Sequence, residues 1–476
     1  MQKAGIDRSP AFLLDTSKRI TEEPMKQLYL KYKGHYRDNF SLAYPVVISQ
    51  LGHTLVALSD SLIIGHTGKV PLAAVSLGNS LFSIFMVTGI GMSYGLTPLI
   101  AQENGRGNKH KIGHLLSHSL IINMTVGVLL SMVIYWGSAR MDLLNQEADV
   151  VEQARPFLRY LGFSFIPLML FLSFKQFAEG LGFTRQAMNI SIIGNLLNIV
   201  VGITLVYGLF GLPRMGVVGV GIATFTDRLL MGITMMFYVL RSPRFKEYLA
   251  TFGFSNIEWG KIKQILGIGT PVALQYIFEV SAFSGAAIMV GWMGSAELAA
   301  HQIALSLAAM TYMMASGISA AAGIKSGNNF GKRDFRELRM SAIASYHMVL
   351  VLMGFTALLF MLGNHILPRF YIDDPQVIPI AAKLLIIAAF FQLFDGTQVV
   401  GLGVLRGLGD VRIPTVITLL AYWGLGLPLG YLLGIRLGLG VEGVWWALLL
   451  GLLAASVLLF VRFHHRTKKL ELQADI

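Results

Sequence analysis

The stretch at residues 44–74, "YPVVISQLGHTLVALSDSLIIGHTGKVPLAA", returns in altered form at residues 270–300 as "TPVALQYIFEVSAFSGAAIMVGWMGSAELAA". Pro45 aligns with Pro271, an offset of 226 residues (271 − 45), and the closing Leu-Ala-Ala triplets align at the same offset. That offset also aligns four pairs of glycines: Gly65 with Gly291, Gly68 with Gly294, Gly91 with Gly317, and Gly105 with Gly331. A register that holds without a gap from residue 45 to residue 105 indicates two homologous halves.

The composition places both halves in a membrane. Hydrophobic residues make up 54% of the 476 residues and charged residues only 13%, whereas soluble proteins carry roughly 25% charged residues. A spanning helix needs about 20 mostly apolar residues, and about twelve runs of that kind can be counted. The predicted spans are 40–64, 72–100, 113–137, 157–181, 187–211, 216–240, 262–290, 297–323, 341–366, 377–403, 413–435 and 441–463.

The longest polar break, residues 241–263, divides these runs into two sets of six. Six is an even number, so both halves enter the membrane from the same side and are related by an axis along the membrane normal. The predicted fold is an all-α polytopic membrane protein with two six-helix bundles related by pseudo-two-fold symmetry. The expected segments are a tail (1–38), a first bundle (39–240), a linker (241–261), a second bundle (262–463) and a tail (464–476).

The net charge of +12 has a topological cause. Roughly 28 of the 38 Lys and Arg residues lie in the tails, the linker and the loops on one side, including Arg406 and Arg412, against about 7 on the other. The positive-inside rule therefore predicts that both termini are cytoplasmic. The expected location is the cytoplasmic (inner) membrane. No nucleic-acid partner is expected. The chain has no Cys, which excludes disulfides and thiolate metal sites.

Two acidic residues lie deep in predicted spans of the second half. Asp395 is about midway along 377–403, with Phe391 and Gln392 one turn before it. Glu279 has Gln275 one turn before and Phe283 one turn after, and Tyr276 lies beside Gln275. Intramembrane acids cost roughly 2.5–3.5 kcal/mol each and are functional by default. A carboxylate beside aromatic rings suits an organic cation. The alternative is that each acid pairs with a neighbouring helix.

The first half carries a third candidate group. Asp60 lies in the outer part of the first span, and Asn195 and Asn198 share one face of the fifth. In one interpretation these residues form a site for Na⁺ or for a proton. In the other they form hydrogen bonds between helices. Four further charged residues are interpreted as structural: Asp227, Arg228, Lys175 and Glu179.

Several other activities lack the residues that they need. The histidines show no metal-like spacing, and "GLGVLRG" follows a spanning helix rather than a strand. The chain has no Walker A pattern, so ATP cannot be the driver within it. No enzyme activity and no cofactor are therefore expected, and transport by this chain must use an ion gradient. One charge that crosses 100 mV yields about 2.3 kcal/mol.

The motifs "FDGTQVVGLGVLRGLGD", "FEVSAF" and "LSDSLIIGHTG" resemble those of the multidrug and toxic compound extrusion (MATE) family, in particular its NorM-like branch. The resemblance covers residues 38–463. It implies that Glu279 and Asp395 are coupling carboxylates, that Na⁺ is held by these two acids if sodium is the coupling ion, and that Phe283 faces a bound drug. By the same resemblance, Asp60 and Asn198 match polar positions implicated in cation coupling.

Two positions depart from the family pattern. Phe391 stands where NorM-like members can carry a Tyr, and Gly202 stands where many members have a polar residue. Both Na⁺ and H⁺ therefore stay open as the coupling ion, in either bundle.

The expected function is secondary active efflux of organic cations such as drugs and dyes, by antiport with Na⁺ or H⁺ through alternating access. The expected substrate-binding residues are Phe283, Gln275, Gln392, Phe391 and Tyr276. Membrane lipids are the expected surroundings, and a monomer is the expected state. The alternatives are a flippase for lipid-linked precursors, an exporter of a non-cationic metabolite, a membrane-embedded enzyme and an ion channel.

Overall fold

The computed structural model describes residues 10–144 and 146–474, and within this part the regular structure is entirely helical. Twelve helical stretches in it are long and apolar enough to cross a membrane, which confirms the predicted number of spans. The first begins at Leu30 and the last ends at Gln473. Residues 1–9 and 475–476 of the predicted tails lie outside the described residues.

The first half contains six crossings. Two of them consist of two helices each, α2 with α3 and α5 with α6, because the chain bends at Tyr94–Leu96 and at Ser164. Pro98 and Pro167 lie shortly after these bends, and proline supplies no backbone N–H to the preceding turn. The helices are α1 (Pro10–Gly65), α2 (Lys69–Ser93), α3 (Thr97–Gly105), α4 (Lys109–Ser138), α5 (Ala148–Phe163), α6 (Phe165–Gly180), α7 (Thr184–Tyr207) and α8 (Val217–Arg241).

The second half repeats this plan. Its fifth crossing, residues 412–436, contains two π-helical segments around α14, at Leu420–Gly426 and Tyr431–Arg436. Gly424, Gly426 and Pro428 lie in or beside them and weaken the regular helical ladder. The helices are α9 (Trp259–Gly291), α10 (Ser295–Lys332), α11 (Phe335–Leu362), α12 (Val377–Gly407), α13 (Arg412–Leu419), α14 (Leu427–Gly430) and α15 (Gly440–Ala474).

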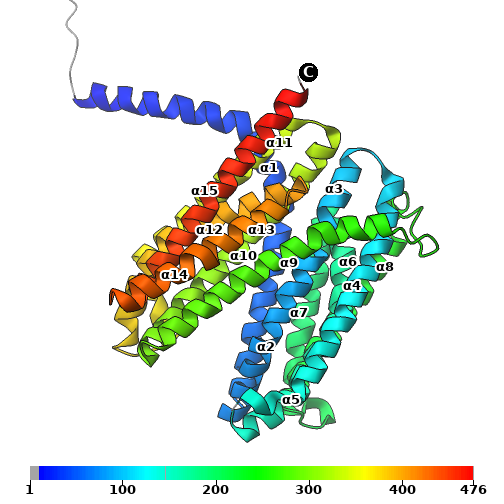
Figure 1. The fold of residues 1–476 in the computed structure, drawn as a ribbon, viewed down its shortest axis with the longest axis vertical. Coiled ribbons are helices and arrows are strands. Elements are labelled where there is room, and N and C mark those ends of the chain that lie inside the picture. Colours follow the sequence, from blue (N-terminus) through cyan, green and yellow to red (C-terminus); the bar gives the residue numbers. More distant parts are fainter. Residues whose placement is uncertain (1–9, 145, 475–476) are drawn as a thin grey trace, which may run out of the picture.

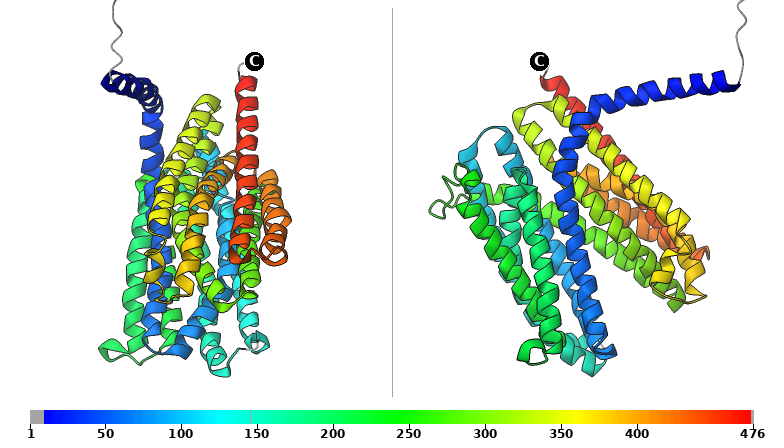
Figure 2. Two further views of the ribbon diagram at one scale, coloured as in Figure 1. Left: turned by 90° about the vertical axis from the view of Figure 1, so that its left-hand side faces the viewer. Right: turned by 180° about the vertical axis from the view of Figure 1, so that it is seen from behind.

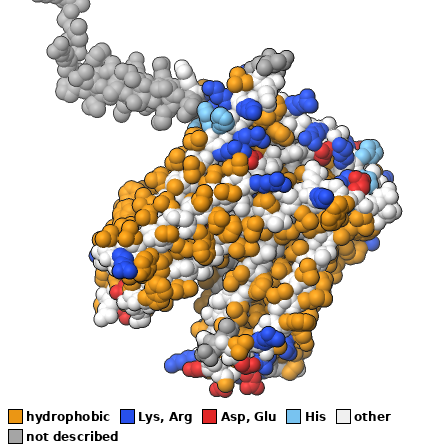
Figure 3. Space-filling view, viewed as in Figure 1, with side chains coloured by type: hydrophobic (Ala, Val, Ile, Leu, Met, Phe, Trp, Pro, Cys, Tyr) orange, Lys and Arg blue, Asp and Glu red, His pale blue; other side chains and the backbone are white. Residues whose placement is uncertain are grey.

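The two bundles lie side by side and diverge toward one end of the molecule (Figures 1 and 2). We call the end at which α15 finishes the terminal end and the opposite end the far end. The space-filling view in Figure 3 shows the surface hollowed between the bundles at the far end, whereas the bundles meet at the terminal end. The molecule is therefore open between its bundles toward one side of the membrane only.

Glycines make the contact at the terminal end close, and they do so in symmetric pairs. A Cβ atom on Gly91 would lie 2.4 Å from Ala273 Cα, and one on Gly317 would lie 2.3 Å from Val47 Cγ2. The two contacts are equivalent in the two halves, because the 226-residue offset relates Gly91 to Gly317 and Val47 to Ala273. Only glycine allows this approach of α2 to α9 and of α10 to α1. The contacts establish the predicted pseudo-two-fold relation.

A second symmetric pair of glycines lies nearer the axis. A Cβ atom on Gly105 would lie 2.0 Å from the carbonyl oxygen of Asn328, and one on Gly331 would lie 2.1 Å from that of Gln102. Gln102 also donates from Nε2 to the carbonyl oxygen of Gly407 at 2.8 Å, which ties α3 to α12. Backbone contacts of α3 with α10 and α12 thus close the terminal end.

The tails and the linker differ from simple polar segments. Helix α1 begins at Pro10 and α15 continues to Ala474, so the described parts of both predicted tails are helical extensions of spans. The linker packs on α4, where Glu258 N donates to His118 Nε2 at 2.8 Å and Gly253 N donates to Ser117 Oγ at 3.0 Å. Lys109 pairs with Glu247, and this hydrogen bond lowers the pKa of the Glu247 carboxyl.

We expect Gly317→Ala to destabilise the protein by about 1–3 kcal/mol, because its methyl group would overlap Val47. The matched control is Gly354→Ala in α11, where nothing lies within 4 Å of the added Cβ atom. That substitution gains helix propensity of up to about 1 kcal/mol. Thermal unfolding of the two purified variants in detergent checks this difference. An equal rise in Tm for both variants would contradict the close contact at the terminal end.

Candidate functional site

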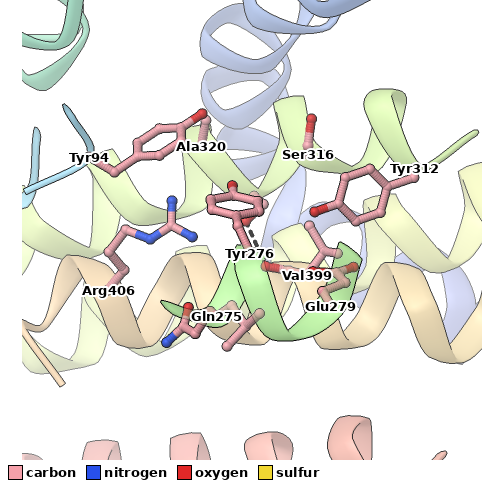
Figure 4. A pocket seen from close by; sticks show the side chains of 11 residues that line it. Tyr94, Gln275, Tyr276, Glu279, Tyr312, Ser316, Ala320, Val399 and Arg406 are labelled. Atoms are coloured by element: carbon pink, nitrogen blue, oxygen red, sulfur yellow. Dashed lines mark hydrogen bonds between the residues drawn. The ribbon is translucent and has the colours of Figure 1, made fainter. Parts of the chain in front are cut away.

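A polar pocket of about 390 Å³ lies between the bundles and is shown in Figure 4. It lies between the far-end opening and the terminal end. The first bundle contributes Tyr94, which follows α2, and the other lining residues come from α9, α10 and α12 of the second bundle. Figure 4 shows Arg406 directed toward Tyr94 and Tyr276, with Glu279 and Tyr312 on the opposite side. The lining residues are Tyr94, Gln275, Tyr276, Glu279, Tyr312, Ser316, Ser319, Ala320, Val399, Leu402 and Arg406.

The two acids of the second bundle lie close together and have no cationic partner. Glu279 on α9 is 6% exposed and Asp395 on α12 is 4% exposed. They are near enough to interact electrostatically. Neither carboxylate forms a hydrogen bond or an ion pair with any residue that the structure describes. A buried acid without a partner is costly in an apolar medium. The two acids together form a site that favours a cation or protons.

Tyrosine side chains surround this pair of acids. Tyr312 on α10 and Tyr422 in the π-helical segment after α13 are both within electrostatic range of Glu279 and of Asp395. The Tyr422 hydroxyl accepts a hydrogen bond from Gln398 Nε2 at 3.0 Å. Tyr312 lines the pocket, so its ring and its hydroxyl oxygen are available to a bound ligand. Sequence reasoning missed Tyr312, because a tyrosine in a spanning helix is ordinary.

The predicted aromatic residues separate into two groups. Tyr276 lines the pocket, where its ring is 6.3 Å from that of Tyr94. Phe283 contacts Phe391 at 6.0 Å and Tyr422 at 5.9 Å between ring centroids, next to the acids but outside the pocket lining. Phe391 is buried and its ring also lies 5.8 Å from that of Trp445. Phe391 is thus part of the core of the second bundle.

The two predicted glutamines differ in the same way. Gln275 lines the pocket, but its Nε2 is engaged by the carbonyl oxygen of Val411 at 3.2 Å and by Thr415 Oγ1 at 3.0 Å. Gln392 is fully buried and its Oε1 accepts a hydrogen bond from Thr356 on α11. Its side chain therefore faces a neighbouring helix of its own bundle rather than the pocket.

The predicted group of the first bundle is a separate cluster. Asp60 on α1 and both Asn195 and Asn198 on α7 are buried. Asn198 donates from Nδ2 to Thr224 Oγ1 on α8 at 3.4 Å. Asp60 Oδ1, Asn198 Oδ1 and both amide atoms of Asn195 have no partner among the described residues. Asp60 is also within electrostatic range of Arg228 and Asp227. This cluster is polar and incompletely paired, and it does not line the pocket.

The four residues interpreted as structural have mixed surroundings. Lys175 Nζ lies 3.8 Å from Glu179 Oε1, within α6. Arg228 donates to Ser164 Oγ at 2.6 Å and covers the ring of Phe82 at 4.8 Å. Asp227 is buried, and its Oδ1 has no partner within the described chain.

The sequence placed Arg406 wrongly. Its position after the tenth run predicted a loop, but α12 continues to Gly407, so Arg406 lies in the last helical turn and lines the pocket. Its guanidinium carbon is 4.6 Å from the centroid of the Tyr94 ring. The pocket is thus acidic toward the middle of the membrane and cationic toward the terminal end.

The donor set around Glu279 and Asp395 suits a small hard cation. Two carboxylates and nearby hydroxyl groups offer oxygen atoms, which are the ligands that hard cations take. The described residues contain no group of three or more His, Cys, Asp or Glu side chains that could hold a metal ion.

Comparisons with known proteins agree with this architecture. A sequence model of the MatE family matches residues 45–204 and 271–432, and the two segments begin at the aligned prolines. The multidrug resistance protein MdtK of Yersinia pseudotuberculosis serotype O:1b (strain IP 31758) is 34% identical over 446 residues, which cover 92% of this chain and 97% of the relative. Two solved structures share the fold at 19% identity. They are the eukaryotic MATE transporter AtDTX14 (TM-score 0.83, covering 93% of this chain and 99% of that chain) and a MATE in the bent conformation (TM-score 0.85, 93% and 97%).

We expect Glu279→Gln to stabilise the purified protein in the absence of a transported cation by up to about 3 kcal/mol, because it removes a charge from a spanning segment. The amide has nearly the same shape and removes the unpaired charge. Glu442→Gln, which removes an exposed partner of Lys383, is the control and should change Tm little. Thermal unfolding in detergent measures both changes. A large loss of stability in Glu279→Gln would indicate that the acid has a structural partner.

Proposed function

Because the chain belongs to the MatE family, as its resemblance to MATE transporters predicted, we propose that it is a multidrug efflux transporter that exports organic cations in exchange for Na⁺ or H⁺. A member of this transporter family is not an enzyme, which agrees with the sequence. The observation that carries the proposal is the pair of buried, unpaired acids, Glu279 and Asp395, beside a pocket with aromatic walls. The name of the MdtK relatives supports the substrate class.

The proposed orientation puts the terminal end in the cytoplasm. Lys and Arg concentrate in the segments at this end, as the positive-inside rule requires of the cytoplasmic side. The far-end opening in Figure 3 then faces the outside of the inner membrane. In this assignment the structure is the outward-open state of an alternating-access cycle, surrounded by lipid and active as a monomer.

The proposed exchange follows from competition for two acids. A cation that enters from outside, Na⁺ or H⁺, neutralises Glu279 and Asp395 and removes the attraction for an organic cation. An organic cation from the cytoplasm binds the same acids once the coupling ion has left. Since both ligands cannot occupy the acids together, exchange follows when they favour opposite-facing states. The cluster of Asp60, Asn195 and Asn198 is a second candidate site for the coupling ion.

The aromatic walls suit the proposed substrates. An organic cation at Glu279 lies between the rings of Tyr276 and Tyr312, and each ring face attracts positive charge by about 0.5–2 kcal/mol. A flippase for lipid-linked precursors or an exporter of a non-cationic metabolite would require a cavity with more basic groups. Among the described residues that line the pocket, Arg406 is the one Lys or Arg and Glu279 is the one acid. Asp395, close to Glu279, adds a second acid, and this acidic surplus favours cationic ligands.

Liposomes that contain the purified protein and a fluorescent organic cation test the function. We expect an imposed Na⁺ gradient or an imposed pH gradient to drive movement of the dye. Glu279→Gln and Asp395→Asn should each abolish this movement, because each amide removes a charge for which the two ligands compete. Glu442→Gln, at an exposed ion pair, is the folded control and should transport normally.

Full dye movement in both amide variants would refute the proposed mechanism. Movement that is lost in Asp60→Asn but kept in the two amide variants would assign coupling to the first bundle instead.

We expect Tyr312→Leu to raise KM for the organic cation about tenfold with little change in kcat, since it removes one ring from the wall while both acids remain. Tyr312→Phe keeps the ring and should retain the original KM. Initial rates of dye uptake over a range of dye concentrations provide both constants. An equal effect of the two substitutions would assign the role to the hydroxyl group rather than to the ring.

A further inference from the structure

The fifth crossing of the second half departs from its counterpart in the first half. The motifs "GLGFTR" (residues 180–185) and "GLGDVR" (407–412) align the two crossings at an offset of 227 residues (412 − 185). At that offset the π-helical stretch Leu420–Gly426, which we call the π segment, corresponds to residues 193–199 inside the regular helix α7. π-helical turns are rare and are frequently found at functional sites. The irregularity thus belongs to the half that carries Glu279 and Asp395.

The two acids lie on helices that have different main neighbours. Helix α9, with Glu279, packs mainly on α2 and α13, whereas α12, with Asp395, packs mainly on α10, α15 and α11. These two helices, both fully described, have little direct contact with each other. The separation of the acids therefore depends on elements that contact both helices. Helix α10 packs on both, and the π segment is bound to both through its side chains.

Trp423 ties the π segment to α9 next to Glu279. Its indole Nε1 donates to the carbonyl oxygen of Phe278, the residue before Glu279, at 3.2 Å and to Ser281 Oγ at 3.2 Å. The side-chain amide of Gln275, one turn before Glu279, donates to α13 of the same crossing. The fifth crossing thus holds α9 on both sides of Glu279.

Tyr422 ties the π segment to α12. Its hydroxyl accepts a hydrogen bond from Gln398 Nε2 at 3.0 Å. Gln398 lies three residues after Asp395, on the same face of α12. Tyr422 is fully buried, and its ring also contacts that of Phe283 on α9, at 5.9 Å between centroids. Two adjacent residues of the π segment therefore connect the helix of one acid to the helix of the other.

The π geometry and these ties support each other. A π-helical turn closes with i→i+5 hydrogen bonds, whereas an α-helical turn closes with i→i+4 bonds. A return of the segment to α-helical geometry would rotate Tyr422 and Trp423 relative to α13. At least one of the two ties would then be lost.

We propose that the π segment sets the separation of Glu279 and Asp395. Trp423 and Tyr422 are its positioning residues, since each acts through a helix that carries an acid. Two carboxylates hold one cation only if both can reach it, and the attraction of each falls with distance. The importance of this separation for transport rests on the proposed exchange, whereas the separation itself can be measured without transport.

The absence of Cys from the chain makes this measurement possible. Ser284→Cys on α9 and Phe390→Cys on α12 place two spin labels at exposed positions. Each label lies five residues from its acid (284 − 279 and 395 − 390). Both helices belong to the second bundle, so a movement of one bundle against the other leaves this distance unchanged.

We expect electron paramagnetic resonance to give one narrow distribution of distances between the two labels. Trp423→Phe keeps a ring but removes the N–H donor, and Tyr422→Phe removes only the hydroxyl, so each should broaden the distribution. Trp446→Phe on α15 is the matched control, because its side chain is 44% exposed and that of Trp423 is 46% exposed. It should leave the distribution unchanged.

The same variants without spin labels test the effect on ion binding, by displacement of tetraphenylphosphonium. We expect Trp423→Phe and Tyr422→Phe each to need roughly tenfold more Na⁺ or H⁺ for half-displacement, as when a partner that orients ion ligands is removed. The Kd for tetraphenylphosphonium at low Na⁺ and alkaline pH should change little, because a bulky cation requires less exact placement of both acids. The double variant should shift no further than the larger single shift, since either change alone disconnects the two helices.

An unchanged distance distribution in both single variants, in protein that elutes as a single symmetrical peak, would overturn the proposal. An equal broadening in Trp446→Phe would also overturn it, because general loss of packing would then be the cause. A broadened distribution with an unchanged half-displacement would refute the link to ion binding. If neither ion displaces tetraphenylphosphonium from the unmodified protein, the proposed exchange fails, and the distances still decide what the π segment does.

Discussion

The cost of placing an unpaired charge in an apolar medium is the constraint on which the rest of this structure depends. It accounts for the concentration of Lys and Arg at one end, and it makes Glu279 and Asp395 sensitive to any cation that can reach them. No side chain of the described chain pairs with these acids, which leaves them open to a mobile ion or a substrate. In the proposed exchange, the cation present on each side of the membrane decides which ligand the acids hold.

The close contact of the bundles at the terminal end determines from which side a cation can reach the two acids. Paired glycines bring α2 to α9 and α10 to α1 at van der Waals distance, so this end is either fully closed or parted. A second cavity, lined by residues of both bundles, lies where the bundles would have to separate.

The sequence predicted much of the architecture. A constant offset between aligned glycines is a strong signal, because symmetric helix contacts require glycine at both equivalent positions, as at Gly91 and Gly317. Glu279 and Asp395 were found because an acid in an apolar run is rare. Arg406 was missed because the end of α12 was placed too early, and Tyr312 because a tyrosine in a spanning helix is ordinary. Only the fold shows that Gln392 and Phe391 face the interior of their own bundle.

The most direct test of the central claim is equilibrium binding of tetraphenylphosphonium to the purified protein over a range of Na⁺ concentrations and, separately, of pH. Competition for Glu279 and Asp395 predicts that one of these ions raises the apparent Kd, and that this dependence is lost in Glu279→Gln and Asp395→Asn. A Kd that is independent of both ions in the unmodified protein would contradict competition for the two acids.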